Sequence, residues 1–149
     1  MAIHVDRFMR RIHGGLHAQA SEFDTENVGP GGGMILMTLA DVEPAPVQLI
    51  ARLMARDKSQ MTRAIKVLER KGLISRSDEA SDARVSLLHL TAKGRRTVDR
   101  IQQALTSVIG QILSPLTADE QRTLGEFLAR LDPCHPQTVP KGRTRSSDV

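Results

Sequence analysis

Apolar residues recur at intervals of three and four along the first part of the chain, which predicts an amphipathic helix over residues 4–20. The positions that fit this spacing are Val5, Phe8, Met9, Ile12 and Leu16. A nearly continuous apolar run, MILMTLA at 34–40, predicts a buried helix. The intervening NVGPGGG at 27–33 predicts a flexible connector, because Gly and Pro interrupt regular structure and no Gly-Lys-Ser/Thr follows to form a phosphate loop.

The middle of the chain predicts two helices and a hairpin. Pro46 is expected at or near the first turn of the first helix. The residues expected on the inward face of that helix are Leu49, Ile50, Leu53 and Met54. A short turn leads to a second helix over about 59–71, which Gly72 ends. Strands are expected at 73–77 and 85–90, joined by the polar loop DEASDA.

The last third of the chain predicts two more helices. Thr91 precedes a long helix over residues 92–113. The apolar seam of that helix consists of Val98, Ile101, Leu105, Val108 and Ile112. The segment TADE at 117–120 has a Thr and a Glu three residues apart, which is a capping box that begins a final helix. Pro133 ends this helix, and the polar tail that follows is predicted to be flexible.

Composition favours a helical, intracellular protein. The 149 residues include three Phe and no Trp or Tyr, so aliphatic side chains must form the core. A single cysteine, Cys134, excludes an internal disulfide and fits a reducing cytoplasm. The sequence has no signal-peptide pattern and no apolar run approaching the roughly 18 residues of a membrane span. We therefore expect a soluble cytoplasmic protein without membrane contact.

Positive charge is concentrated in the middle of the chain. The net charge is +4, and residues 52–100 hold 13 Lys and Arg against 6 Asp and Glu, whereas the rest holds 8 against 11. A basic segment between less basic flanks predicts a docking surface for an anionic partner such as nucleic acid. Ser, His, Cys and carboxylate residues show no spacing typical of a catalytic site, so we expect neither an enzyme nor a cofactor.

The predicted helix 59–71 has an apolar face and a face rich in hydrogen-bond donors. Its inward residues are Met61, Ala64, Ile65 and Leu68. The outward stripe and its neighbours give the candidate DNA-binding residues Lys58, Ser59, Gln60, Thr62, Arg63, Lys66 and Arg70. Hydroxyl, amide, ammonium and guanidinium groups can donate to base edges and phosphates. An ordinary solvated helix face has the same composition, so the neighbouring elements must decide between the two interpretations.

A helix, a turn, a basic amphipathic helix and a hairpin follow one another in the order of a winged helix-turn-helix. In this module the second helix enters the major groove of DNA, and the hairpin, or wing, reaches the neighbouring minor groove. The sequence resembles the MarR family of bacterial transcriptional regulators over about residues 34–131. The residues that carry the resemblance are Asp57, Ser59, Thr62, Arg63, Leu68, Glu69, Gly72, Leu73, Asp82, Arg84, Leu90, Thr91 and Gly94. The chain departs from the family pattern at Ala55, where Gly is common, at Arg56, where an apolar residue is common, and in the acidic wing residues Asp78 and Glu79.

The predicted wing carries an acid and an arginine two residues apart. Asp82 and Arg84 lie on the same side of a strand, so the carboxylate can hold the guanidinium in a bidentate pair. A narrow minor groove has an enhanced negative potential that attracts an inserted arginine. We expect Arg84 to read the minor groove and Asp82 to orient it. The alternative is an exposed ion pair that contributes about 0–1 kcal/mol to stability.

The resemblance implies a mainly α fold with a small β-hairpin wing, in which helices from both chain ends interlock into a homodimer. It divides the chain into an N-terminal dimerisation helix with its connector (1–33), a DNA-binding domain (34–91), C-terminal dimerisation helices (92–132) and a flexible tail (133–149). Such a dimer would bind double-stranded DNA at a pseudo-palindromic operator. Most members of the family are similar in being repressors that a small phenolic or aromatic acid releases. The candidate ligand-binding residues are Met9, Arg11, His13, Met34 and Met37.

Other sensing chemistries and partners give alternative interpretations. His13 and His17 are four residues apart, as two metal ligands on a helix could be, but no third ligand is near them, so we expect no metal. Redox sensors that resemble this chain usually place their cysteine in the first helix, whereas Cys134 follows the last one, which disfavours a thiol switch. A winged helix that docks a protein is the remaining alternative to DNA binding, and the basic segment 52–100 argues against it.

Overall fold

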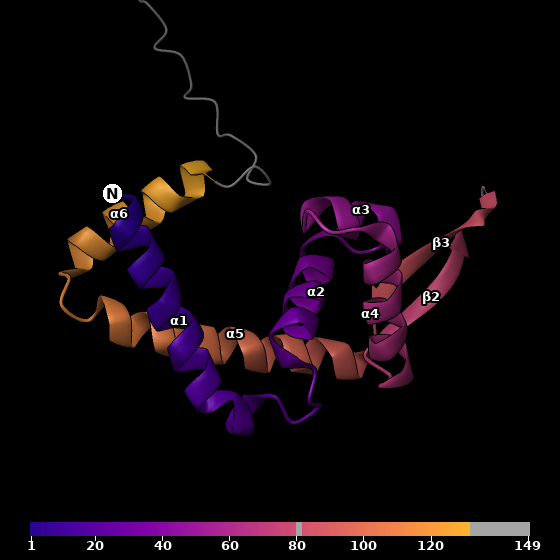
Figure 1. Ribbon diagram of the computed structural model, residues 1–149, viewed down its shortest axis with the longest axis horizontal. Helices are drawn as coiled ribbons and strands as arrows, with labels where there is room; N and C mark the ends of the chain where they lie inside the picture. The colour runs from indigo at the N-terminus through magenta and orange to yellow at the C-terminus, as the bar shows by residue number, and fades with distance from the viewer. Residues whose placement is uncertain (80–81, 132–149) are drawn as a thin grey trace, which may run out of the picture. The chain divides into compact units, whose positions relative to one another are not determined.

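Six helices and three strands make up the described part of the chain (Figure 1). The computed structural model describes residues 1–79 and 82–131, with the side chains of 78–79 and 82–85 excepted. The elements are α1 (Ala2–Phe23), α2 (Gly29–Val42), β1 (Ala45–Pro46), α3 (Val47–Leu53), α4 (Lys58–Arg70), β2 (Ile74–Glu79), β3 (Asp82–Leu90), α5 (Ala92–Leu113) and α6 (Ala118–Leu131). Residues Met1–Ile112 form one compact unit, and Leu113 begins a second. The mainly helical fold with a small antiparallel sheet confirms the fold class predicted from the sequence.

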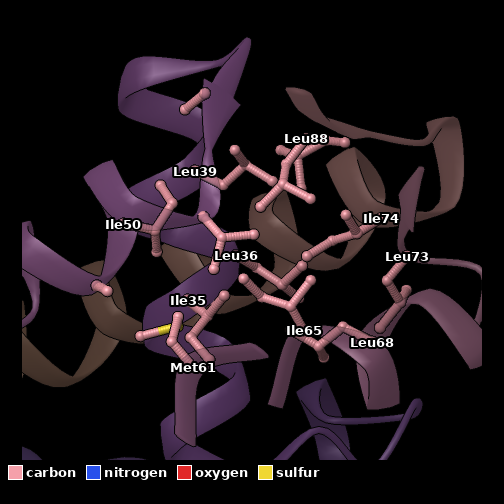
Figure 2. Close-up of a cluster of buried hydrophobic side chains, with 14 of the residues drawn as sticks. Ile35, Leu36, Leu39, Ile50, Met61, Ile65, Leu68, Leu73, Ile74 and Leu88 are labelled. Atoms are coloured by element: carbon pink, nitrogen blue, oxygen red, sulfur yellow. The ribbon is translucent and has the colours of Figure 1, made fainter. Parts of the chain in front are cut away.

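Aliphatic side chains from α2, α3, α4 and the sheet form the core of the larger unit (Figure 2). Its buried members include Ile35, Leu36, Leu39, Ile50, Met61, Ile65, Leu68, Leu73, Ile74 and Leu88. Three of them, Met61, Ile65 and Leu68, come from one face of α4, as the sequence predicted. Burial of an aliphatic side chain of this size contributes about 1.5–3 kcal/mol, so these three residues determine which face α4 turns away from the core.

The hairpin of β2 and β3 confirms the two predicted strands, with Arg76 opposite Leu88. Both strands run further than predicted, because β2 continues to Glu79 and β3 begins at Asp82, inside the segment DEASDA that was expected to be loop. It extends away from the helices of its unit (Figure 1). The pairing shifts between Asp78 and Glu79, so the two strands are irregularly paired towards the tip. The shift lies within the acidic part of the wing that departs from the family pattern.

A third strand, β1, was not predicted. Its two residues, Ala45 and Pro46, pair with Leu88 and Leu87 of β3 and add an outer strand to the sheet, in the order β1-β3-β2. A proline has no N–H to donate, and an edge strand is the place where a sheet tolerates it. Pro46 is also the N-cap residue, immediately before α3, which agrees with its predicted place at or near the first turn of this helix.

The glycine-rich segment 29–33 is the first turn of α2 and not the flexible connector that was predicted. The Asp24 carboxylate accepts hydrogen bonds from the backbone N–H groups of Val28 and Gly29, both over 2.8 Å. Pro30 occupies the first helical turn, where its missing N–H costs nothing. Gly33 is buried, and a Cβ built on it would lie 3.3 Å from Cδ1 of Ile101 in α5. The glycines therefore serve a helix start and a close helix contact.

The inward face of α3 was predicted correctly except at Leu53. Ile50 is fully buried, and Leu49 and Met54 are half-buried against the core. Leu53 is 41% exposed, so its predicted inward position was wrong. The helix begins at Val47, and the residues that share the Val47 face at helical spacing are Ile50, Ala51 and Met54. Leu53 lies at the edge of this face and is the last residue of the short helix.

The long helix α5 spans the residues that the sequence predicted, 92–113. Its buried residues are Gly94, Thr97, Val98, Ile101, Ala104 and Val108. Val108 lies so close to α1 that a Cβ built on Gly15 would be 2.6 Å from its Cγ1. This close approach explains why α1 tolerates a glycine in its interior.

The helix α6 belongs to the second unit. Thr117 and Glu120 form the predicted capping box: the Thr117 N–H donates to Glu120 Oε2 over 2.8 Å, and the Glu120 N–H donates to Thr117 Oγ1 over 3.3 Å. The hydrogen bonds from Thr117 hold the pKa of the Glu120 carboxyl below its usual value. Neither α6 nor α1 contains a buried residue.

Candidate nucleic-acid interface

The helix α4 begins at a complete N-terminal cap. The Asp57 carboxylate accepts from the backbone N–H of Ser59 over 2.8 Å and from that of Gln60 over 3.2 Å, and the Ser59 hydroxyl donates to the same oxygen. The Ser59 hydroxyl is the largest cause of a pKa of Asp57 below its usual value, followed by the Gln60 N–H. The family-like aspartate is therefore the residue that fixes the start of the second helix.

The turn that precedes this cap contains a strained residue. Ala55 has a φ of +49°, in the left-handed region that only glycine adopts without a steric cost. This is the position at which the resemblance expects glycine. The turn therefore holds an alanine in a backbone conformation that suits glycine.

The outward face of α4 gathers all seven candidate residues that the sequence placed there. Six are exposed and Thr62 is half-buried. The Thr62 hydroxyl donates to the Lys58 carbonyl over 2.8 Å, so two hydroxyl protons of the stripe, those of Ser59 and Thr62, are engaged within the protein. Their lone pairs can still accept. None of the four cations Lys58, Arg63, Lys66 and Arg70 forms an ion pair with another described residue.

The described part of the wing is tied to α4 by an ion pair that the sequence did not reveal. Arg76 of β2 donates from Nε to Glu69 Oε1 over 2.5 Å and from Nη2 to Glu69 Oε2 over 3.3 Å. Further along the hairpin, Ser77 Oγ and His89 Nε2 are 2.7 Å apart. The backbone places Asp82 and Arg84 at the start of β3, but their side chains lie outside the described residues, so their pairing stays a prediction.

The base of the wing is locked to the end of α4 by Thr91 and Gly94. The Thr91 hydroxyl donates to the Gly72 carbonyl over 2.7 Å and accepts from the Gly94 N–H over 3.0 Å. A Cβ built on Gly94 would lie 2.1 Å from the Leu73 carbonyl oxygen. The Leu-Thr-x-x-Gly segment therefore joins the end of α4, the base of the wing and α5 at one point.

Two lysines tie the C-terminal end of α4 to the loop between α1 and α2. Lys71 Nζ donates to the carbonyls of Glu26 and Asn27 over 2.7 and 2.8 Å. Lys93 Nζ lies 2.7 Å from Glu26 Oε2 and 3.0 Å from the Lys71 carbonyl oxygen. The hydrogen bond from Lys93 is the largest cause of a pKa of Glu26 below its usual value.

Glu43 supports the other side of the sheet. One of its carboxylate oxygens accepts from the Leu90 N–H over 2.7 Å, and the other accepts from the Arg95 guanidinium. Neither Glu43 nor the two lysines was predicted as a site residue. Their partners are 22 to 67 positions away in the sequence, so no local spacing indicates them.

Comparison with known proteins identifies the family. A model of the MarR family matches residues 32–86. YxaD of Bacillus subtilis (strain 168), an HTH-type transcriptional regulator, is 31% identical over 125 residues, which are 84% of this chain and 85% of that protein. The chain belongs to the MarR family. The resemblance drawn from residues 57–94 is confirmed, and with it the class of DNA-binding transcriptional regulator.

Solved structures share the fold of this MarR-family chain. A probable transcriptional regulator from Pseudomonas aeruginosa is 28% identical, with a TM-score of 0.63 over 86% of this chain and 96% of that chain. The transcriptional repressor CouR, solved bound to a 23-mer DNA duplex, is 24% identical, with a TM-score of 0.68 over 88% of this chain and 91% of that chain. At this identity, CouR supports the winged-helix fold alone.

The candidate ligand residues of this MarR-family regulator lie on two helices. Met9, Arg11 and His13 are exposed on α1, whereas Met34 is exposed and Met37 half-buried on α2. A hollow of about 510 Å³ lies along α5, and its lining residues are Asp99, Gln102, Gln103, Thr106 and Ser107. None of the five candidates lines this hollow, so their role stays a prediction.

The alternative sensing chemistries gain no support from the residues that the structure describes. Within 1–79 and 82–131, no group of three or more His, Cys, Asp or Glu side chains is placed to hold a metal ion. His13 and His17 are both exposed on α1. Cys134 lies outside the described residues. No described helix is long and apolar enough to cross a membrane.

Proposed function

We propose that this MarR-family regulator binds a specific operator with α4 in the major groove. The observation that carries the proposal is the outward face of α4, a capped helix with four cations that have no ionic partner in the described chain. Charges that are not used within the protein are free to meet phosphates and base edges. CouR, a repressor of the same fold, is solved bound to a DNA duplex, which supports duplex DNA as the partner.

The roles of the side chains follow from their positions on α4 and in the wing. Arg63 is central on the exposed stripe and is proposed to read a base edge, together with Gln60 beside it. Lys58, Lys66 and Arg70 are proposed to contact phosphates. Ser59 and Thr62, whose hydroxyl protons are engaged, are proposed to accept hydrogen bonds from base amino groups.

In the wing, Arg84 is proposed to enter the minor groove with Asp82 as its orienter. A double-mutant cycle on operator affinity tests the pair. Asp82→Ala should weaken binding less than Arg84→Ala, and most of its effect should vanish once Arg84 is absent, with a coupling above about 0.5 kcal/mol. Additive losses, or a large fall in melting temperature for either variant, would mean that the pair is structural.

Arg63 gives the direct test of base reading. The operator is first obtained by sequencing the DNA fragments that the pure protein retains from a random pool. Arg63→Ala should then weaken operator binding by about 1–3 kcal/mol and binding to random duplex much less. Arg122→Ala on α6, an exposed helical arginine outside the DNA-binding domain, is the matched control and should leave both affinities unchanged. If Arg63→Ala lost the same affinity for the operator and for random duplex, Arg63 would contact a phosphate and would not read a base.

A salt titration separates DNA from a protein partner. The logarithm of the binding constant should fall linearly with the logarithm of salt concentration, with a slope near −0.9 for each phosphate contact. Removal of Lys66, by Lys66→Met, should reduce that slope by about 1. A chain that docks protein instead would retain random duplex weakly at low salt and would enrich no common DNA sequence.

We further propose that two chains form a homodimer through α1, α6 and the end of α5. The support is apolar surface on helices that contain no buried residue: Ile3, Val5 and Met9 on α1, and Phe127, Leu128 and Leu131 on α6, with Leu131 78% exposed. A dimer would cover these residues and would present two α4 helices to half-sites about 34 Å apart. Sedimentation that shows a stable monomer at micromolar concentration would contradict the dimer.

Release from DNA by a small phenolic or aromatic acid is proposed on the resemblance, with Met9, Arg11, His13, Met34 and Met37 as its contacts. Arg11 is exposed and can pair with a carboxylate. A screen of benzoates and phenols for release of the labelled operator provides the test. The concentration of an aromatic acid that is needed to release the operator should be higher for Arg11→Met than for the wild type. The concentration of a neutral phenol that is needed should be unchanged.

A further inference from the structure

The ion pair of Glu69 and Arg76 links the two parts of the protein that are proposed to read DNA. Glu69 lies in the last turn of α4, and Arg76 is the third residue of β2. Both guanidinium-to-carboxylate contacts of a bidentate pair are present, over 2.5 and 3.3 Å. The Arg76 side chain is 33% exposed and the Glu69 side chain 24% exposed, so the pair is neither buried in the core nor freely solvated.

Other contacts already hold the base of the wing. Leu73 and Ile74 are buried, Leu88 of β3 is buried opposite Arg76, and Thr91 bonds to the end of α4. On the β2 side, Ser75, Arg76 and Ser77 are exposed, so beyond the pairing of β1 with Leu87 and Leu88 no buried side chain of β2 fixes the direction in which the described hairpin leaves α4. A bidentate arginine pair has a fixed planar geometry, so it can set that direction.

A small change of direction at Arg76 has a large effect at the groove-reading end of the wing. Arg76 is paired with Leu88 of β3, and Arg84 is four residues before Leu88, towards the tip of the hairpin. At about 3.3 Å per residue, Arg84 lies about 13 Å beyond this point. A rotation of about 10° would then move it by about 2 Å, which is enough to break a hydrogen bond.

We infer that Glu69 and Arg76 are positioning residues that hold the wing at one angle to α4, so that both grooves of the operator are read together. The inference rests on the proposed function of α4 and Arg84. As a positioning residue, Glu69 should strengthen DNA binding, whereas its negative charge alone should weaken it. A carboxylate near DNA repels phosphates, so its neutralisation should strengthen binding, whereas loss of a positioning contact should weaken it.

The experiment measures operator affinity of Glu69→Gln alone and combined with Arg84→Ala or Arg63→Ala. The single variant should bind about threefold to tenfold more weakly, the range expected for residues in one network. The same change should cause no loss in the Arg84→Ala background, because no wing contact remains to be positioned. It should keep its full effect in the Arg63→Ala background. Asp119→Asn, which removes the carboxylate of an exposed ion pair on α6, is the control and should leave affinity unchanged.

A second measurement does not depend on DNA. Residual dipolar couplings of the amides in β2 and in α4 give the angle between wing and helix in the free protein. The couplings of the wild type should fit a single angle between wing and helix, whereas those of Glu69→Gln should not. The double variant that exchanges the two charges, Glu69→Arg with Arg76→Glu, should recover both the single angle and the operator affinity.

The outcomes separate the inference from the proposed function. Unchanged or tighter binding by Glu69→Gln, or an equal loss with and without Arg84, overturns the inference. Unchanged operator binding by both Arg63→Ala and Arg84→Ala overturns the proposed function, and the angle measurement then still decides whether the pair positions the wing.

Discussion

Gly94→Ala should destabilise the fold strongly, although it places alanine in a helix. A Cβ at this position would lie 2.1 Å from the Leu73 carbonyl oxygen, more than an ångström inside a van der Waals contact. The obstacle is backbone, and it cannot rotate away. That carbonyl also accepts hydrogen bonds from the N–H of Thr91 over 3.1 Å and from its hydroxyl over 3.3 Å, so any shift disturbs the base of the wing.

The loss of stability expected for Gly94→Ala is the sum of three contributions. Overpacking costs about 1–3 kcal/mol, and contact with a fixed carbonyl puts this site at the upper end. Disturbed hydrogen bonds to Leu73 add about 1 kcal/mol, and the better helix propensity of alanine returns about 1 kcal/mol. The expected loss is therefore about 3 kcal/mol, which for a chain of this length lowers the melting temperature by about 6–12 °C.

Gly110→Ala is the matched control within the same helix. A Cβ built on Gly110 meets no atom within 4 Å, so alanine there should stabilise the protein by about 0.5–1 kcal/mol. Both variants are compared with the wild type by thermal and urea unfolding at one protein concentration, because self-association would shift the midpoint. A Gly94→Ala protein as stable as Gly110→Ala would show that α5 does not approach Leu73 closely and would refute the account of the wing base.

Three further predictions concern the ends of α4. Ala55→Gly should stabilise the protein by about 0.5–1 kcal/mol, because it relieves a left-handed alanine, and unchanged or lower stability in urea would contradict the strain. The lowered pKa of Asp57 means that its stabilising effect is present above its unfolded pKa and is lost as pH falls through the folded pKa; Asp57→Asn should therefore lose less stability than the wild type as pH falls below about 4, measured by melting temperature against pH. Lys71→Met should cost about 1 kcal/mol through its two lost carbonyl contacts, whereas Lys66→Met on the same helix should stay within about 0.5 kcal/mol, and equal effects of the two would remove Lys71 as a link to the α1–α2 loop.

The sequence predicted the features that depend on neighbours within a few residues. The bounds of α5, the capping box at Thr117 and Glu120, the inward face of α4 and the hairpin were all confirmed. Each is determined by helical periodicity, by a cap three residues away or by a turn. These local preferences are present in the sequence itself, and tertiary packing reinforced them here.

The features that the sequence did not predict depend on partners that are distant in the chain. β1 is a strand only because Leu87 and Leu88 supply its pairing partners from more than forty residues away. The start of α2 was misjudged because Asp24 caps it from outside the glycine run, and because Ile101 requires small residues there. A run of glycines is read as flexible from its own propensity, but close packing against another helix favours the same residues.

The side chains at and near α4 divide into those that support the helix and those that we propose read DNA. The supporting residues are engaged: Asp57 with the first turn, Glu69 with Arg76, and Lys71 with the α1–α2 loop. The cations of the exposed stripe have no ionic partner in the described chain, so changing them should alter which operator is bound and leave stability nearly unchanged. Substitution of Asp57 or Lys71, which hold α4 itself, should instead move the whole reading surface, and its effect on affinity should appear for every operator base at once. The affinity for a panel of operators with single base changes distinguishes the two classes. Arg63→Ala should remove the preference for one base at a single operator position, whereas Lys71→Met should lower the affinity for every operator by the same factor.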